Sequence, residues 1–269
     1  TIEGSVVCRD IRRMHVRNRG TYSARNTSKG DIVHSAYCVF TALGDGASLD
    51  DVRSRFLDGS LIHLSSRNSR LRTWGTLQHY FIAHGIQWIW DDLIEASGKG
   101  EHSQEFLSLL YLHFALGDRL TYDFVTRVVW SRWNDHSGRV SSEDIVFILD
   151  QASETQQQIR QWTEQSRIKL SRSILAALRD FGILEGVREK RIVKPALPLS
   201  TVRHILRILT AEGVRGLDIL RDDTWRLFLC REHEVADALA RLAQERVIRY
   251  ERTGSTVVLQ IPPEWESDT

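Results

Sequence analysis

The 269-residue sequence predicts a mainly α-helical fold, a helical bundle with helix-turn-helix or winged-helix-like modules and a small C-terminal β-hairpin. Apolar residues recur with helical spacing along most of the chain. All four prolines lie after residue 194, so no proline interrupts a helix before that point. Two β-branched runs joined by a glycine-containing turn occur only near the end of the chain, which predicts a single hairpin there.

The length of the chain suggests two or three domains. We divide it into an N-terminal helical domain with a helix-turn-helix-like pair (1–120), a central winged-helix-like segment (121–197) and a C-terminal helical module with the hairpin (198–269). Pro195 and Pro198 bracket the second boundary.

Two helices are predicted in the first part of the chain after residue 47. One runs from Ser48 to Asp58, with acidic residues in its first turn, where negative charge suits the helix dipole. The other begins at Ser65 or Ser66 and runs to about His84. One of its sides is predicted to pack and carries Leu71, Trp74, Gln78 and Ile82. The other side carries residue types that contact phosphates, although such a face needs no ligand: Ser69, Arg72, Thr73, Thr76 and Tyr80.

Further helices are predicted over 101–116, 121–133, 142–152, 200–211 and 232–246. The first two are rich in aromatic residues, which we assign to the core rather than to base stacking. Ser200 is the predicted N-cap of the fourth. After the last helix, Val247–Tyr250 and Thr256–Ile261 read as a hairpin with Gly254 in its turn.

The most informative segment is 163–194, because it places a helix with one basic face directly before a basic hairpin-like stretch. At 100° per residue one face is apolar and consists of Leu170, Ile174, Ala177, Leu178 and Phe181. The opposite face consists of Lys169, Arg172, Ala176 and Arg179. Thr163 is the predicted N-cap and Gly182 follows the helix end. The arrangement is typical of a winged helix on DNA, and the alternative is a solvated basic face of an ordinary helix.

Charge is unevenly distributed although the formal net charge is only +1. Residues 157–194 hold nine basic and four acidic residues, and residues 1–30 hold seven and two. Residues 86–120 hold two basic and six acidic residues. A nucleic-acid contact would therefore have to come from this uneven distribution rather than from the net charge, although folding can still bring the basic and acidic stretches together.

Several classes of chemistry lack a sequence signal. The cysteines Cys8, Cys38 and Cys230 share no metal-ligand or disulfide spacing, which favours a reducing cytoplasm. The glycine-containing stretches at Gly44–Gly46 and Ser97–Glu101 match neither a dinucleotide fingerprint nor a phosphate loop. We therefore expect no enzymatic activity, no cofactor, no metal site, no small-molecule substrate and no membrane association.

The chain resembles the BrxA family of BREX bacteriophage-defence systems. The resemblance rests on soft motifs whose order and spacing carry the specificity: Tyr22-Ser-Ala, Ser28-Lys-Gly, the run from Ser65 to Trp74, the segment from Trp162 to Leu184, Trp225-Arg-Leu-Phe-Leu, the stretch Leu242–Tyr250 and the terminal Val258-Leu-Gln-Ile-Pro. It implies a small, non-catalytic, mainly helical cytoplasmic protein that binds DNA and is encoded beside methyltransferase, ATPase and phosphatase-like components. Residues 1–20 fall outside it.

The combined hypothesis is a non-catalytic accessory protein that contacts double-stranded DNA largely through phosphates. The predicted contact residues are Lys169, Arg172, Arg179, Arg188, Lys190, Arg191, Arg67, Arg70 and Arg72. We expect weak sequence preference, because we assign no Asn or Gln to the basic face around Ala176. Two alternatives stay open, a scaffold that binds only other defence-system proteins and a transcriptional regulator of its own operon. The acidic helix 232–246 makes the C-terminal module the weaker DNA candidate.

Overall fold

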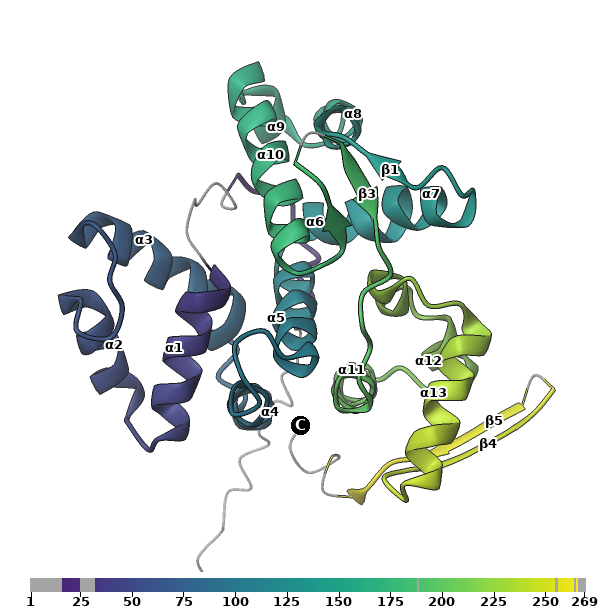
Figure 1. Cartoon of the computed structure of the whole chain (residues 1–269). Coiled ribbons are helices and arrows are strands. Elements are labelled where there is room, and N and C mark those ends of the chain that lie inside the picture. Colours follow the sequence, from purple (N-terminus) through teal and green to yellow (C-terminus); the bar gives the residue numbers. More distant parts are fainter. Residues whose placement is uncertain (1–15, 25–31, 188, 255, 264, 266–269) are drawn as a thin grey trace, which may run out of the picture.

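The computed structural model describes residues 16–24, 32–187, 189–254, 256–263 and 265. Helices dominate this part of the chain and the strands are short, which confirms the predicted mainly α-helical class (Figure 1). None of the helices described combines the length and the apolar composition that crossing a bilayer requires.

The N-terminal helices form a small packed unit. It consists of α1 (Ile32–Gly44), α2 (Leu49–Asp58), α3 (Arg67–Leu77), the π-helical turn η1 (Gln78–Ile82) and α4 (Gln87–Ser97). Helix α1 packs on α4, and α2 packs on α3. The Ser48 side chain accepts a hydrogen bond from the Asp51 amide and caps α2 as predicted.

The predicted packing side of the helix after Ser66 is wrong in part. Leu71 is 46% exposed, whereas Thr73 and Tyr80 from the supposed solvent side are buried. Trp74 packs against Phe56 of α2 with ring centroids 5.4 Å apart, so α2 fixes which side of α3 is covered. The π-turn η1 then shifts the register and turns Tyr80 toward Phe114 of the core.

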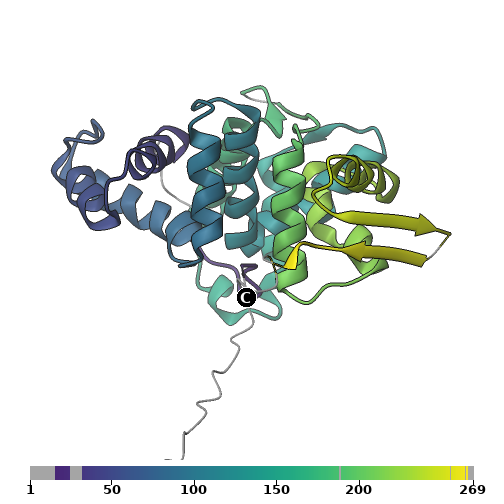
Figure 2. The same cartoon turned by 90° about the horizontal axis from the view of Figure 1, so that it is seen from below.

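Helix α5 (Gln104–Gly117) is the centre of the molecule, and every residue from Ser108 to Gly117 is buried. A helix that is apolar on all sides has to be surrounded by protein. Helices α4 and α11 (Leu199–Ala211) both pack against it (Figure 2). At its end a Cβ atom on Gly117 would lie 2.7 Å from Cδ1 of Tyr80, so this contact requires glycine.

The central segment combines helices with a three-stranded antiparallel sheet. In chain order it consists of α6 (Arg119–Asp123), π-helical η2 (Phe124–Val129), α7 (Trp130–Asn134), β1 (Arg139–Val140), α8 (Ser142–Ser153), α9 (Gln157–Arg160), α10 (Glu164–Asp180), β2 (Leu184–Glu185) and β3 (Lys190–Ile192). The strand order is β1-β3-β2, and α10 packs on α8. The predicted hairpin after the long helix is therefore present.

The C-terminal segment follows α11 with α12 (Leu217–Arg221), the 3-10 helix η3 (Asp223–Phe228), α13 (Glu232–Gln244), β4 (Arg249–Thr253) and β5 (Thr256–Gln260). The predicted hairpin is confirmed, with Arg249 paired to Gln260 and Gly254 at φ +60°. The predicted Ser200 cap is wrong, because α11 already begins at Leu199 after Pro198. The fixed φ of proline suits that position.

Residues 16–24, which we call the N-terminal strap, bind the C-terminal segment through hydrogen bonds and ion pairs. Arg17 donates two hydrogen bonds to the Asp222 carboxylate, at 3.1 and 3.0 Å, and its Nε lies 2.7 Å from Oε2 of Glu212. The Glu212 side chain is only 2% exposed. Burial raises the pKa of Glu212, and the Arg17 charge opposes that shift.

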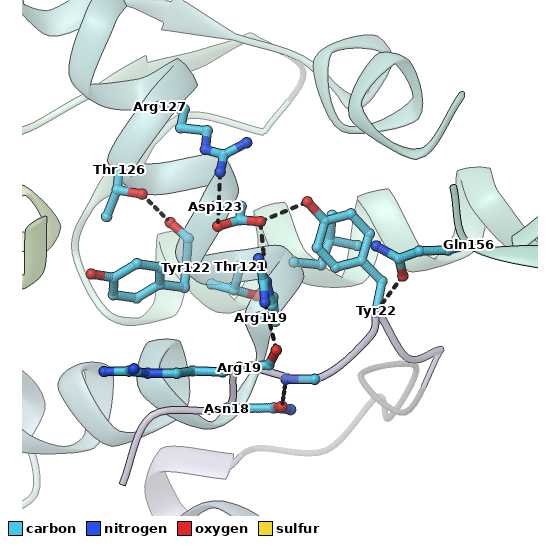
Figure 3. Close-up of polar contacts among 12 residues, drawn as sticks. Asn18, Arg19, Tyr22, Arg119, Thr121, Tyr122, Asp123, Thr126, Arg127 and Gln156 are labelled. Atoms are coloured by element: carbon cyan, nitrogen blue, oxygen red, sulfur yellow. Dashed lines mark hydrogen bonds and ion pairs between the residues drawn. The ribbon is translucent and has the colours of Figure 1, made fainter. Parts of the chain in front are cut away.

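The strap also fastens the central segment (Figure 3). Tyr22 donates its hydroxyl hydrogen to Asp123 at 2.7 Å, and its amide donates to Gln156 at 2.8 Å. Asn18 donates its side-chain amide to the Gly117 carbonyl at the end of α5. One extended segment thus connects elements that lie between 99 and 134 positions away in the sequence.

A buried polar row crosses the contact between α4, α5 and α11. His204 Nδ1 lies 2.5 Å from the Asp92 carboxylate, and His204 Nε2 lies 2.8 Å from His113 Nε2. With Asp92 ionised, His204 donates its Nδ1 hydrogen to that carboxylate. His113 Nδ1 has no partner in the described part of the chain. Burial lowers the pKa of His113 well below its usual value.

This row predicts that acidification destabilises the protein. Below pH about 6.5 the unfolded chain protonates His113 but the folded chain does not, so stability present above that pH is lost as pH falls. We expect urea unfolding at pH 7 and 5.5 to show a smaller pH effect for His113→Gln than for the unsubstituted protein. The exposed His63→Gln is the control and should keep the full effect. Equal pH effects in all three proteins would contradict the assignment.

Candidate nucleic-acid interface

Helix α10 forms as predicted and presents two different faces. Thr163 accepts a hydrogen bond from the Ser166 amide at 3.2 Å and caps its start, and Gly182 at φ +80° follows its end. Leu170, Ile174 and Leu178 are completely buried, which fixes the rotation of the helix about its axis. The opposite side is therefore held outward.

The outward side of α10 carries its cations. Lys169 and Arg172 are exposed, and neither forms an ion pair with any other residue that the structure describes. Arg179 is also exposed, but its guanidinium pairs with the neighbouring Asp180 at 2.8 Å. Ala176 is half-buried between them. Among the described residues, Lys169 and Arg172 are therefore the cations of α10 whose charge is not neutralised by an ion pair.

Lys169 and Arg172 line a groove of about 1230 Å³ between α10 and the N-terminal helices. Its α10 wall consists of Thr163, Gln165, Ser166, Ile168, Lys169, Arg172, Ser173, Ala176, Ala177 and Asp180. Its opposite wall consists of Ile32, Val33, Thr73, Thr76 and His102, and the buried Phe114 of α5 contributes to the lining. Two surfaces that the sequence suggested separately, on α3 and on α10, thus meet in one place.

Gln165 is a groove residue that the sequence prediction missed. It lies in the first turn of α10, about 40° from Lys169 around the helix axis. The same 100° spacing that assigned Lys169 and Arg172 to one face also assigns Gln165 to it, so the signal was present. The expectation that this face has no amide side chain is wrong.

The hairpin after α10 contributes less charge than predicted. Lys190 is buried, and its ammonium donates a hydrogen bond to the Gly186 carbonyl at 2.7 Å. Burial lowers the pKa of Lys190. A Cβ atom on Gly186 would lie 2.3 Å from the Glu189 carbonyl oxygen, so the Lys190 contact closes a turn that only glycine permits. Lys190 therefore stabilises the hairpin rather than facing a ligand.

The other predicted hairpin cations have different positions. Arg191 pairs with Glu185 across β2 and β3, yet its side chain is 70% exposed. Arg188 lies outside the described residues. Lys194 pairs with Glu234 of α13 and so ties the end of this segment to the C-terminal helices. Arg191 is thus the described hairpin residue that can still reach a phosphate.

Of the three predicted arginines on α3, Arg67 and Arg72 are exposed and have no ion pair within the described ranges. Arg70 instead donates hydrogen bonds to the carbonyls of Leu57, at 2.8 Å, and Leu64, at 3.1 Å. Arg70 thereby stabilises the loop between α2 and α3, and its guanidinium serves the fold rather than a ligand.

The C-terminal hairpin and α13 carry paired charges. Glu232 accepts hydrogen bonds from Arg221, at 3.1 Å, and Arg252, at 2.6 Å, and Arg249 pairs with Glu251 at 2.9 Å. No group of three or more His, Cys, Asp or Glu residues with metal-binding geometry occurs in the part of the chain described.

Comparisons with known proteins agree with the helical architecture. A crystal structure of an uncharacterized protein from Magnetospirillum magneticum superimposes with a TM-score of 0.57 at 12% identity, over 78% of this chain and 100% of that chain. At that identity the likeness concerns the fold alone. No curated protein matches the sequence significantly. The family model BrxA matches residues 20–208, which is well over half of the chain, and the chain therefore belongs to the BrxA family.

Proposed function

We propose that this protein binds duplex DNA through the outward face of α10, without catalysing a reaction, as a cytoplasmic component of a BREX phage-defence system. The observation that carries the proposal is the pair of exposed, unpaired cations Lys169 and Arg172 on a helix whose other side is locked into the core. Membership of the BrxA family supports the defence setting.

The element order around α10 supports binding in the major groove. Helices α6–α7, strand β1, helices α8 and α10, and the β2–β3 hairpin follow one another in the order of a winged helix. In helix-turn-helix proteins the helix that corresponds to α10 enters the major groove. Its cations and hydroxyl groups are suited to phosphate oxygens.

Salt dependence of binding tests this function against a purely protein-binding scaffold. Four described cations, Lys169, Arg172, Arg179 and Arg191, can neutralise phosphates, so log K should fall with log salt at a slope of about −3 to −4. Fluorescence anisotropy with a labelled random duplex between low and physiological salt measures this slope. No binding to any duplex, or binding that does not depend on salt, would refute the proposal.

Gln165 supports a second candidate function, transcriptional regulation. A Gln side chain in the first turn of a recognition helix can bond both N6 and N7 of adenine. A regulator prefers its own site by a factor of about a thousand or more. Competition between an operon-derived duplex and a random one, repeated with Gln165→Ala, separates the two functions. A preference that Gln165→Ala abolishes would favour the regulator.

A further inference from the structure

We infer that a single DNA duplex is held from two sides, with one of its sugar–phosphate backbones seated in the groove between α10 and the N-terminal helices α1 and α3. The inference rests on the proposed function, because it assumes that α10 enters the major groove. It adds the N-terminal helices as a second DNA-binding element.

Lys169 and Arg172 line the groove that separates α10 from α1 and α3, so they do not lie on an isolated outer surface. A duplex that α10 reads must therefore extend into this groove. Figure 1 shows α3 and α1 on one side of α10, beside its lower part and not along its whole length.

B-DNA geometry limits where the two backbones of the duplex run. The major groove is about 12 Å wide and admits one α-helix, so a sugar–phosphate backbone runs along each side of a helix that enters it. On one side of α10 the described neighbours are α1 and α3. The backbone on that side has to pass between the two walls of the groove.

The opposite wall of the groove has a composition that a DNA backbone can approach. Thr73, Thr76 and His102 line this wall together with Ile32 and Val33. Thr73 and Val33 are buried, and the Thr76 hydroxyl donates to the Arg72 carbonyl at 3.0 Å, so His102 is the exposed polar side chain of the wall. None of the described residues that line this wall is acidic. Arg72 is exposed on α3 and lies about 40° from Thr76 around the helix axis, next to this wall. A wall without carboxylates among the described residues, flanked by an unpaired cation, suits a phosphodiester backbone.

Site-directed photo-cross-linking tests the inference on the full chain. A benzophenone maleimide is attached at Thr76→Cys, at Ala176→Cys or at the control position Arg53→Cys in a Cys8→Ser, Cys38→Ser background. Cys230 stays in place because burial raises its pKa to about 11, which makes it a slow thiol toward maleimide. Arg53 is exposed on α2 and does not line the groove.

Irradiation with a labelled duplex should give protein–DNA cross-links from Thr76→Cys and from Ala176→Cys, and few from Arg53→Cys. In unlabelled protein Arg72→Glu should weaken duplex binding about tenfold, whereas the matched Arg53→Glu should leave it unchanged within about twofold. Circular dichroism of each variant confirms that it is folded.

The outcomes separate this inference from the proposed function. Cross-links from Ala176→Cys alone, together with an unchanged affinity of Arg72→Glu, would overturn the two-sided grip and leave DNA binding by α10 intact. Absence of duplex binding by the unsubstituted protein would instead refute the proposed function. Cross-links from both Thr76→Cys and Ala176→Cys, together with weaker duplex binding by Arg72→Glu, would support the inference that the duplex is held from two sides.

Discussion

Replacement of both Lys169 and Arg172 by glutamate is expected to weaken duplex binding by at least about 100-fold at low salt. Each substitution removes a phosphate contact and places a negative charge near the DNA backbone, so both effects lower affinity. Because both side chains are exposed and unpaired in the described structure, the fold should not change. Anisotropy titrations should also show the log K–log salt slope reduced in magnitude by about 2.

The matched control reverses two charges on the C-terminal winged-helix-like module, with Arg241→Glu on α13 and Arg249→Glu on β4. Both residues are exposed, and the overall charge change is identical. We expect a loss of affinity below about fivefold, because acidic residues surround these cations. A greater loss for the control than for the α10 variant would move the main DNA contact to the C-terminal hairpin. Truncation after residue 197 is a poor substitute, since α11 packs on the central helix α5.

Replacement of Arg17 by methionine is expected to lower the free energy of unfolding by about 3 kcal/mol. The substitution leaves the buried Glu212 carboxylate without its closest cation and removes the bidentate contact to Asp222. Urea denaturation followed by circular dichroism measures the loss. Arg19→Met is the matched control, because the Arg19 side chain is 68% exposed and lies 3.7 Å from the same carboxylate. An exposed pair of this kind contributes at most about 1 kcal/mol.

The destabilisation by Arg17→Met should depend on pH. Burial raises the pKa of Glu212 in the folded state. Protonated Glu212 therefore favours the folded protein over the unfolded chain. This stabilisation is lost as the pH rises through the raised pKa. Without Arg17 the folded pKa rises further, and the cost of ionisation at neutral pH increases. The loss of stability should therefore be greater at pH 8 than at pH 5. A cost no larger than that of Arg19→Met, or one that is larger at pH 5, would contradict the role given to Arg17.

Most helices could be predicted from the sequence because their signals are local. The Thr163 cap, the apolar spacing from Leu170 to Leu178 and the glycine at 182 all lie within twenty residues, and the structure confirms the helix that they predict. The hairpin at Gly254 is confirmed for the same reason. The π-turn after α3 carries no such local signal, since it is stabilised where Tyr80 meets Phe114 of α5. The packing side of that helix was predicted wrongly as a consequence.

The residues of the candidate site also fall into those that the sequence identifies and those whose role only the structure reveals. Helical spacing alone identifies Lys169 and Arg172 as one exposed face, and it would also have identified Gln165. It gives no sign that Lys190 closes its own turn or that Arg70 holds two backbone carbonyls, because both roles depend on where the loop carbonyls come to lie. Counting basic residues therefore overestimated the charge available to a ligand.

The sequence by itself determined the helical class, the basic face of α10, the two hairpins and the resemblance to the BrxA family, which the family match then established. The tertiary structure alone decided that α10 faces α3 across a groove and that the basic N-terminal segment uses Arg17 to bind Asp222, 205 positions away. The physical reason is the distance along the sequence over which each kind of interaction acts. Periodicity and capping act between neighbours within a few residues, whereas the partner of a buried charge or an exposed face is set by packing between distant helices.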